Sequence, residues 1–343
     1  MQERPRWVFW LVLLGLLAAV IFSIAGGILL GSADLNVSTV IDVIKLKLFG
    51  IENEELKRSA ISIVWELRLP RVLLALAAGG GLAVAGAAMQ SVTQNVMADP
   101  YILGASSGAS AAVAFAFVIG GSFASSNAVI SVFAFGGSML SLLLVYGVGM
   151  VGRAGSSSRL VLSGMAISVI LNAATQFFIS IAPDAQTVRS VTSWTMGSLS
   201  NARWNNLLIP FVGSIIGSLF FMFMSQAYNL LSQGDETAIS LGVDVRRVKQ
   251  ATIIVVSFVT GIVVAAGGVI GFIGFIVPHI IRILVGADHR RVFPLSFIGG
   301  SLFLLWMDVL ARTIMAPQEL AVGIFTAFCG GPFFVWLLYR KNK

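Results

Sequence analysis

Long apolar segments, separated by short polar ones, follow one another along almost the whole chain. A helix that crosses a bilayer needs about 20 mostly apolar residues, and ten segments come near that length. Their approximate ranges are 7–30, 71–92, 105–121, 127–151, 160–182, 205–229, 250–268, 271–286, 292–314 and 319–339. The pattern therefore predicts an all-α, polytopic membrane protein. We expect about ten transmembrane helices in a single domain over residues 1–343.

Composition supports a membrane protein over a soluble one. Of the 343 residues, 57% are hydrophobic and 11% are charged, and the mean hydropathy is +0.93. A soluble domain carries about 25% charged residues, so much of this apolar surface has to face lipid. The net charge of +7 comes mainly from Lys and Arg in the segments between apolar runs. There these residues set orientation, and we expect no nucleic-acid partner.

Orientation follows from where these cations lie. The segments on the side of both termini hold most of the Lys and Arg residues, which predicts that both termini are cytoplasmic. The first apolar run, 7–30, is longer than the apolar region of a secretion signal and lacks a convincing cleavage site. We therefore interpret it as the first transmembrane helix.

The segment 31–70 is the exception to the charge rule, because it lies outside yet carries charges of both signs. We expect a folded outer segment with a short helix at Val37–Leu48. At its end Arg68 and Arg71 flank a proline, immediately before a run rich in Gly and Ala. Small residues let helices pack closely in a membrane. We expect both arginines to face an outside partner, and the polar turn Asn95–Tyr101 to serve the inner face.

One cytoplasmic loop, 233–250, has a helical pattern of its own. Thr237, Ala238, Leu241 and Val245 recur at helical spacing. Gly242 is suited to end one short helix and Asp244 to cap the next. The loop therefore predicts a compact helix–turn–helix on the cytoplasmic face. It is either an ordinary amphipathic connector or a docking site for a soluble partner.

Motifs for catalysis are absent from the sequence. There is no Gly-Lys-Ser/Thr phosphate-binding loop, so the chain is not expected to hydrolyse ATP through that fold. G-x-S-x-G, H-E-x-x-H and C-x-x-C are also missing. Two histidines and the single Cys329 are too few for a transition-metal relay. We expect no catalytic residue, no metal site and no cofactor in this chain.

Few ionisable residues lie within the apolar runs. Asp308 is the clearest, and Arg312 lies four residues further on, so the two can pair on one helix face. An acid inside the membrane is also a candidate proton relay, but the nearby Arg312 favours a structural pair. His279, which follows a proline, is interpreted as part of a helix irregularity. The stretches 98–110 and 287–301 share a few residues; if they are copies of one segment, they form an inverted repeat, an arrangement common in transporters.

Several motifs resemble those of one transporter family. They are R-L-P-R at 68–71, G-A-A-M-Q…N-V-M-A-D-P-Y-I-L-G-A-S-S-G-A at 86–109, L-S-G-M-A-I at 162–167, G-D-E-T-A-I-S-L-G-V at 234–243, G-F-I-G-F-I-V-P-H-I-I-R at 271–282, D-V-L-A-R at 308–312, and the segment 319–338. In this order they resemble the membrane permease subunit of bacterial ABC importers for iron–siderophores, haem and cobalamin, the type II importers.

The resemblance implies a dimer of permeases in the bacterial cytoplasmic membrane, with two ATP-binding subunits inside and a substrate-binding protein outside. ATP and Mg²⁺ would be bound by the separate ATPase. By position, Arg68, Arg71 and Arg312 resemble the arginines that dock the binding protein. The loop 233–250 resembles the coupling helices; its candidate contacts are Asp235, Glu236, Ala238, Leu241, Gly242 and Val243. Ser156, Ser157 and Ser158 resemble the cytoplasmic gate.

The cargo is less constrained than the class of transporter. A bare metal ion needs ligands from the protein, whereas a chelate carries its own, and the scarcity of His, Cys and intramembrane acids favours a chelate. Within the family we expect a ferric siderophore, with haem and cobalamin as alternatives. Two other hypotheses stay open: a secondary carrier that works without an ATPase, and a membrane scaffold that transports nothing. The dimer partner is either an identical or a homologous chain.

Overall fold

The computed structural model describes residues 5–31, 33–51, 53, 56–120, 126–149 and 157–341, and over these ranges every regular element is a helix. The elements before the middle of the chain are α1 (Arg6–Leu29), α2 (Val37–Phe49), α3 (Arg58–Ile61), η1 (Ser62–Arg68), α4 (Leu69–Thr93), η2 (Tyr101–Ala105), α5 (Ser106–Ile119), α6 (Asn127–Gly149) and α7 (Ser157–Ser180). Those after it are α8 (Ala185–Thr195), α9 (Trp204–Phe223), α10 (Ser225–Leu231), α11 (Asp235–Ser240), α12 (Val245–Gly267), α13 (Ile273–Val285), α14 (His289–Thr313) and α15 (Val322–Lys341).

The predicted membrane-spanning segments are all helical. Eight helices of the described chain are long and apolar enough to cross a membrane, and two shorter apolar helices, Leu103–Ile119 and Ile273–Val285, correspond to the two short spans. The all-α polytopic fold predicted from the sequence is thereby confirmed. The short helix expected at Val37–Leu48 is also present, as α2.

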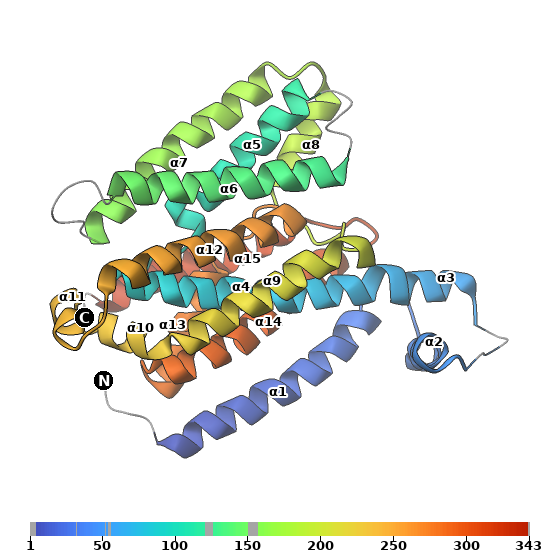
Figure 1. Cartoon of the computed structure of the whole chain (residues 1–343). Coiled ribbons are helices and arrows are strands. Elements are labelled where there is room, and N and C mark those ends of the chain that lie inside the picture. Colours follow the sequence, from blue (N-terminus) through green and yellow to red (C-terminus); the bar gives the residue numbers. More distant parts are fainter. Residues whose placement is uncertain are drawn as a thin grey trace.

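The helix α4 lies at the centre of the molecule. It packs against α9, α12, α13 and α14, while α5, α6, α7 and α8 form a group on one side and α1 lies on the other (Figure 1). Of the eight long spans, α4 is the most buried and α1 the least. The run of Gly and Ala between Arg71 and Gln90 therefore packs against protein and not against lipid.

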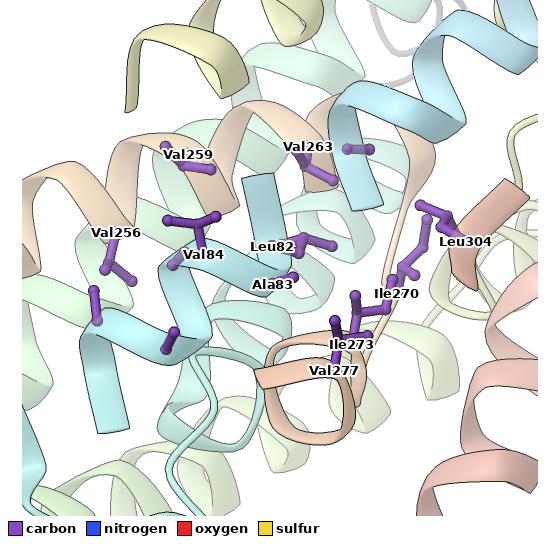
Figure 2. Packing of buried hydrophobic residues seen from close by; sticks show 14 of the residues in the cluster. Leu82, Ala83, Val84, Val256, Val259, Val263, Ile270, Ile273, Val277 and Leu304 are labelled. Carbon is purple, nitrogen blue, oxygen red and sulfur yellow. The ribbon is translucent and has the colours of Figure 1, made fainter. Parts of the chain in front are cut away.

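Small residues explain how so many helices reach α4. A Cβ added at Gly79 would lie 2.2 Å from the carbonyl oxygen of Gly300 in α14, and one added at Gly86 would lie 2.2 Å from the Cα of Gly274 in α13. Backbones in such contact leave no room for a side chain. Around these contacts Val256, Val259 and Val263 of α12 and Ile273 and Val277 of α13 pack with Leu82, Ala83 and Val84 of α4 (Figure 2).

Three segments differ from the expected pattern. The second span begins before residue 71, because α3, η1 and α4 form one continuous helical stretch from Arg58. Its π-helical part directly precedes Pro70, which cannot donate a backbone hydrogen bond, and wider turns of this kind accommodate such a loss. The helix α8 was not expected; Asp184 caps it by accepting from the Thr187 N–H at 2.7 Å. The expected span 205–229 is divided into α9 and α10 at Met224.

Contacts along α4 give the directions of its neighbours. Gly86 lies against Gly274 and Gln90 against Arg282, so α4 and α13 run the same way. Ser91 contacts His289 and Arg71 contacts Asp308, so α14 runs the opposite way. The stretches that follow α4 and α13 therefore lie at the same end of the bundle. These two stretches therefore do not form an inverted pair, and the possible inverted repeat does not rest on them.

Candidate docking sites at the two ends of the helix bundle

The two ends of the bundle differ in which side chains they expose. We call the end that holds Arg68, Arg71 and Arg312 the arginine end. The opposite end holds α10 and α11 and is called the loop end; α10 and α11 lie far from α2 and α3 in Figure 1. The site residues predicted from the sequence fall at these two ends.

Arg68 is 5% exposed and binds the end of α1. Its Nη1 donates to the carbonyl oxygens of Ile28 at 2.7 Å and Leu29 at 2.8 Å, and its Nη2 donates to that of Ala33 at 2.5 Å. The last carbonyls of a helix have no partner within the helix, and a cation is favourable there. Arg68 thus satisfies the C-terminal end of α1.

Arg71 and Arg312 share the carboxylate of Asp308. Arg71 Nε donates to Asp308 Oδ1 at 2.9 Å and Oδ2 at 3.0 Å, and its Nη1 donates to Glu319 Oε2 at 2.8 Å. Arg312 Nε lies 3.6 Å from Asp308 Oδ2, and its Nη2 donates to Gly27 O at 2.6 Å. The side chain of Asp308 is fully buried, whereas that of Glu319 is 36% exposed. The expected pair of Asp308 with Arg312 is present, and Arg71 completes it.

The three predicted docking arginines are therefore buried and have partners within the chain. Arg71 is 7% exposed and Arg312 is 2% exposed. Their role in docking stays a prediction, and direct contact with a partner would require their guanidinium groups to leave these positions. Two cations that we did not single out, Arg189 on α8 and Arg203 before α9, are exposed. Trp204 Nε1 donates to Trp65 O at 2.8 Å, which places Arg203 at the same end.

At the loop end, the chain forms the helix–turn–helix that the sequence predicts. The first helix, α11, ends at Ser240, and Gly242 follows with a φ of 84°, a conformation that glycine adopts without strain. Asp244 then caps α12 by accepting from the Arg247 N–H at 3.1 Å. Both boundary residues inferred from the sequence are confirmed.

The exposed residues of this loop are both apolar and charged. Leu241 is 59% exposed and Ile239 is 61% exposed, while Ala238 between the helices is fully buried. Glu236 and Gly242 are exposed, and Val243 is half-buried. Asp235 is held by Lys249, whose Nζ donates to its Oδ2 at 2.5 Å. The result is a compact projection with two apolar side chains on its surface; sequence reasoning missed Ile239.

The remaining predicted sites are less informative. Ser156 lies outside the described residues, and Ser157 and Ser158 begin α7 with side chains that are not described, so the gate stays a prediction. His279 lies within α13 one residue after Pro278, and its ring is 5.7 Å from that of Phe333. Among the described residues, no group of three or more His, Cys, Asp or Glu side chains could hold a metal ion.

Comparisons with known proteins define the class. The model of the FecCD transport family matches residues 15–340. The chain is 37% identical over 344 residues, which is all of this chain and 97% of the relative, to the hemin transport system permease protein of Yersinia pestis. It is 36% identical over 330 residues, 95% of this chain and 97% of the relative, to the probable iron chelatin transport system permease protein of Helicobacter pylori.

A third relative and a solved structure extend these matches. The vitamin B12 import system permease protein of Vibrio cholerae is 34% identical over 280 residues, 82% of this chain and 83% of the relative. A structure described as an inward-facing conformation of a putative metal-chelate type ABC transporter has a TM-score of 0.82 and 27% identity. That match covers 96% of this chain and 99% of the other.

The fold and these matches define a multi-pass membrane permease. The chain belongs to the FecCD transport family, because the family model covers nearly its whole length. The resemblance inferred from the motifs is confirmed.

Proposed function

We propose that this chain is the permease subunit of an ATP-driven importer that carries a ferric siderophore across the bacterial cytoplasmic membrane. Three relatives carry names that refer to hemin, an iron chelatin and vitamin B12. All three are chelates that bring their own metal ligands. A pathway for such a cargo has no need of a metal site in the protein, and no donor cluster is found among the described residues.

The observation that carries an ATP-driven mechanism is the projection formed by α11 and the start of α12. Exposed apolar side chains on a short helix and the turn after it can anchor in a groove of a partner. Here Ile239 and Leu241 are exposed at the loop end, outside the core of the bundle. We propose that two ATP-binding subunits dock at this end, that they bind ATP and Mg²⁺, and that this chain itself is not an enzyme.

At the arginine end we propose docking of a substrate-binding protein. Arg68, Arg71 and Arg312 support this surface from within, by fixing the ends of α1, α4 and α14. The exposed Arg189 and Arg203 are then the cations that meet acidic groups of the partner. Direct contact by the three buried arginines is the competing hypothesis. In this orientation both termini are cytoplasmic, and a second permease subunit, identical or homologous, completes the pathway within the lipid.

The test is uptake by the chain reconstituted in liposomes with its co-purified ATPase and binding protein. We expect uptake of a ⁵⁵Fe-labelled siderophore that requires ATP inside the vesicles, where the ATP-binding subunits face. Uptake by the purified chain alone would instead establish a secondary carrier, and no uptake under any condition would favour a scaffold.

Hemin is the second candidate cargo, because the full-length match at 37% identity is to a hemin permease. Competition distinguishes the two cargoes. If excess hemin abolishes siderophore uptake and is itself accumulated with ATP, whereas excess cobalamin has no effect, the cargo assignment changes to haem. The same assay with cobalamin as the competitor tests the third alternative.

A further inference from the structure

A buried carboxylate beside the centre of the bundle has no cationic partner among the described residues. Asp99 follows α4 in the turn before η2 and is 4% exposed. Its Oδ1 accepts from the Tyr101 N–H at 2.8 Å, whereas its Oδ2 has no hydrogen-bond partner among the described residues. We expected the polar residues of this turn to serve the inner face, but Asp99 lies in the interior.

The unpaired oxygen faces the first turn of α13. A Cβ added at Gly274 would lie 3.2 Å from Asp99 Oδ2. The Phe275 N–H donates to Phe272 O at 3.2 Å and also interacts with the Asp99 carboxylate, but it makes no well-aligned hydrogen bond to Oδ2. The positive end of a helix dipole is a favourable place for a carboxylate. It does not by itself supply a donor to Oδ2.

A small cavity adjoins this oxygen. It is lined by Asp99, Tyr101, Ser106, Thr260 and Gly274 together with apolar side chains, and the volume open to the centre of a water molecule is about 10 Å³. Thr260 of α12 is 3% exposed, and its Oγ1 also lacks a partner among the described residues. Two unsatisfied polar atoms from different elements thus adjoin one cavity.

The size and polarity of the cavity indicate what it can bind. Empty cavities in proteins are apolar, and a volume of roughly 10–15 Å³ on this measure holds one water. A hard cation such as Mg²⁺ or Ca²⁺ needs about six oxygen ligands, more than the two free polar atoms supply. We propose that this cavity binds a single water molecule, which donates to Asp99 Oδ2 and hydrogen-bonds with Thr260 Oγ1. The water joins the turn after α4 to α12 and α13.

The direct test is a cryo-EM map of the chain in lipid nanodiscs, at a resolution that shows ordered waters elsewhere in the protein. The proposal expects a density peak within hydrogen-bond distance of both Asp99 Oδ2 and Thr260 Oγ1. An empty cavity in a map with other buried waters overturns it.

A matched pair of variants gives a second test. Thr260→Val keeps the shape but removes the hydroxyl, so with a bound water we expect a melting temperature several degrees lower. In a dry cavity the same change removes an unsatisfied group and leaves the melting temperature unchanged or higher, which would contradict the proposal. Ser296→Ala is the control, because Ser296 Oγ is also buried and unpaired among the described residues but does not line the cavity. We expect no loss of stability there.

A second, independent inference rests on hydrogen bonds at the loop end. His289, at the start of α14, bonds to two other helices through both ring nitrogens. Its Nε2 lies 2.6 Å from Ser91 Oγ of α4, and its Nδ1 lies 2.8 Å from Asn229 Oδ1 of α10. We call Ser91, Asn229 and His289 the His289 cluster. Figure 1 shows α10 beside α11 at this end.

The hydrogen bonds of Asn229 fix the proton positions in this cluster. Asn229 Oδ1 accepts from the backbone N–H of His289 at 2.8 Å, and its Nδ2 donates to Asp288 Oδ1 at 2.7 Å. An amide oxygen can only accept, so His289 Nδ1 carries a proton. Nε2 is then an acceptor for the Ser91 hydroxyl, whose single proton also lies within hydrogen-bond distance of Ala87 O at 3.0 Å. Every polar group of the cluster has a partner, and the three helices are bonded in one defined arrangement.

The His289 cluster connects the loop 233–250 to the contact between α4 and α14 in the core. From Ser91 and His289, α4 and α14 stay in contact through Gly79 and Gly300 and on to Arg71 and Asp308 at the arginine end. On the other side, Asn229 lies six residues before the start of α11. A displacement of the loop by a partner would therefore move α10, and through His289 the α4–α14 pair.

We infer that Ser91, Asn229 and His289 are positioning residues that transmit movement of the coupling loop to α4 and α14; this inference rests on the proposed function. The test uses the reconstituted importer and measures how far cargo-loaded binding protein stimulates ATP hydrolysis. We expect Asn229→Ala and Ser91→Ala to lose at least half of the stimulation while the unstimulated rate stays unchanged. Ser131→Ala is the matched control, because Ser131 Oγ donates to Ala265 O between α6 and α12, away from α10.

The outcomes separate this inference from the function it rests on. Full stimulation in both cluster variants overturns the inference, while wild-type transport leaves the proposed function standing. An equal loss in Ser131→Ala also overturns it, because any broken helix contact would then have the same effect. If the wild-type assembly shows no ATP-dependent uptake, the proposed function itself fails.

Discussion

The arginine end and the loop end use charged and apolar residues in opposite ways. At the arginine end the prominent charges are buried and neutralised by groups of the same chain, as in the contacts of Asp308 with Arg71 and Arg312. At the loop end Asp235 pairs with the side chain of Lys249, while apolar Ile239 and Leu241 are exposed. A charged motif in a membrane protein can therefore hold helices together, and the proposed docking surface exposes a leucine and an isoleucine.

Removing the shared carboxylate at the arginine end should have the largest effect. Asp308→Asn leaves the buried Arg312 without its counter-ion and leaves Arg71 paired with Glu319 alone, and breaking a buried ion pair costs about 3–5 kcal/mol. We expect this loss in thermal or denaturant unfolding of the detergent-solubilised chain. Asp244→Asn is the control, because the Asp244–Arg247 pair is exposed and such pairs contribute less than about 1 kcal/mol. Equal stability of the two variants would show that the Asp308 carboxylate does not stabilise the fold through its contacts with Arg71 and Arg312.

Added volume on α4 should come next. Gly79→Ala places a Cβ 2.2 Å from the Gly300 carbonyl oxygen, and overpacking of this kind costs about 1–3 kcal/mol. Gly136→Ala in α6 is the matched control, since nothing lies within 4 Å of its added Cβ. There the better helix propensity of Ala should leave stability equal or higher. A melting temperature that falls equally in both variants would argue against close contact between α4 and α14.

At the loop end, the effect should fall on transport and not on stability. Leu241→Asp removes an exposed apolar contact, so stability should change by less than about 0.5 kcal/mol. ATP-dependent uptake should fall roughly tenfold, the effect of losing about 1.4 kcal/mol of binding. Leu208→Ala is the control for losing an exposed apolar side chain elsewhere, because Leu208 is 68% exposed and lies on α9, outside the loop. If the Leu241→Asp variant kept full uptake, the loop would be an ordinary connector and not a docking site.

The smallest effect should come from the exposed cations of the arginine end. Arg189→Glu and Arg203→Glu reverse charges on the surface, so affinity for the binding protein should fall severalfold at low salt. At 0.1 M salt, exposed charges more than about 10 Å apart are largely screened from each other, so the difference in affinity should shrink as salt is added. Affinities unchanged at low salt would leave the buried arginines as the better candidates for docking.

The sequence was most informative where periodicity and length decide the structure. The ten spans, the helix in the first loop and the boundaries at Gly242 and Asp244 were all predicted, because each depends on local spacing or on a capping residue. What local pattern could not show is which partner a polar residue meets. Arg71 and Asp308 are far apart in the chain, and only the packing of α4 against α14 brings them together.

Two other features illustrate the same limit. Asp99 lies in a polar turn that the sequence placed at the inner face, yet its side chain is buried beside α13. The helix α8 is short and polar, so the pattern of apolar spans does not indicate it, although Asp184 is a good capping residue. Both depend on how the chain returns toward the core, which residue spacing does not encode.

The contrast between the two ends is tested most directly by the position of Arg71 in the assembled importer. A cryo-EM structure with the binding protein docked would give the distance from its guanidinium group to the Asp308 carboxylate. In the present structure Arg71 Nε is 2.9 Å from Asp308 Oδ1. We predict that this ion pair stays intact in the complex while exposed cations contact the partner. A guanidinium group of Arg71 that has left Asp308 for a carboxylate of the binding protein would contradict this account.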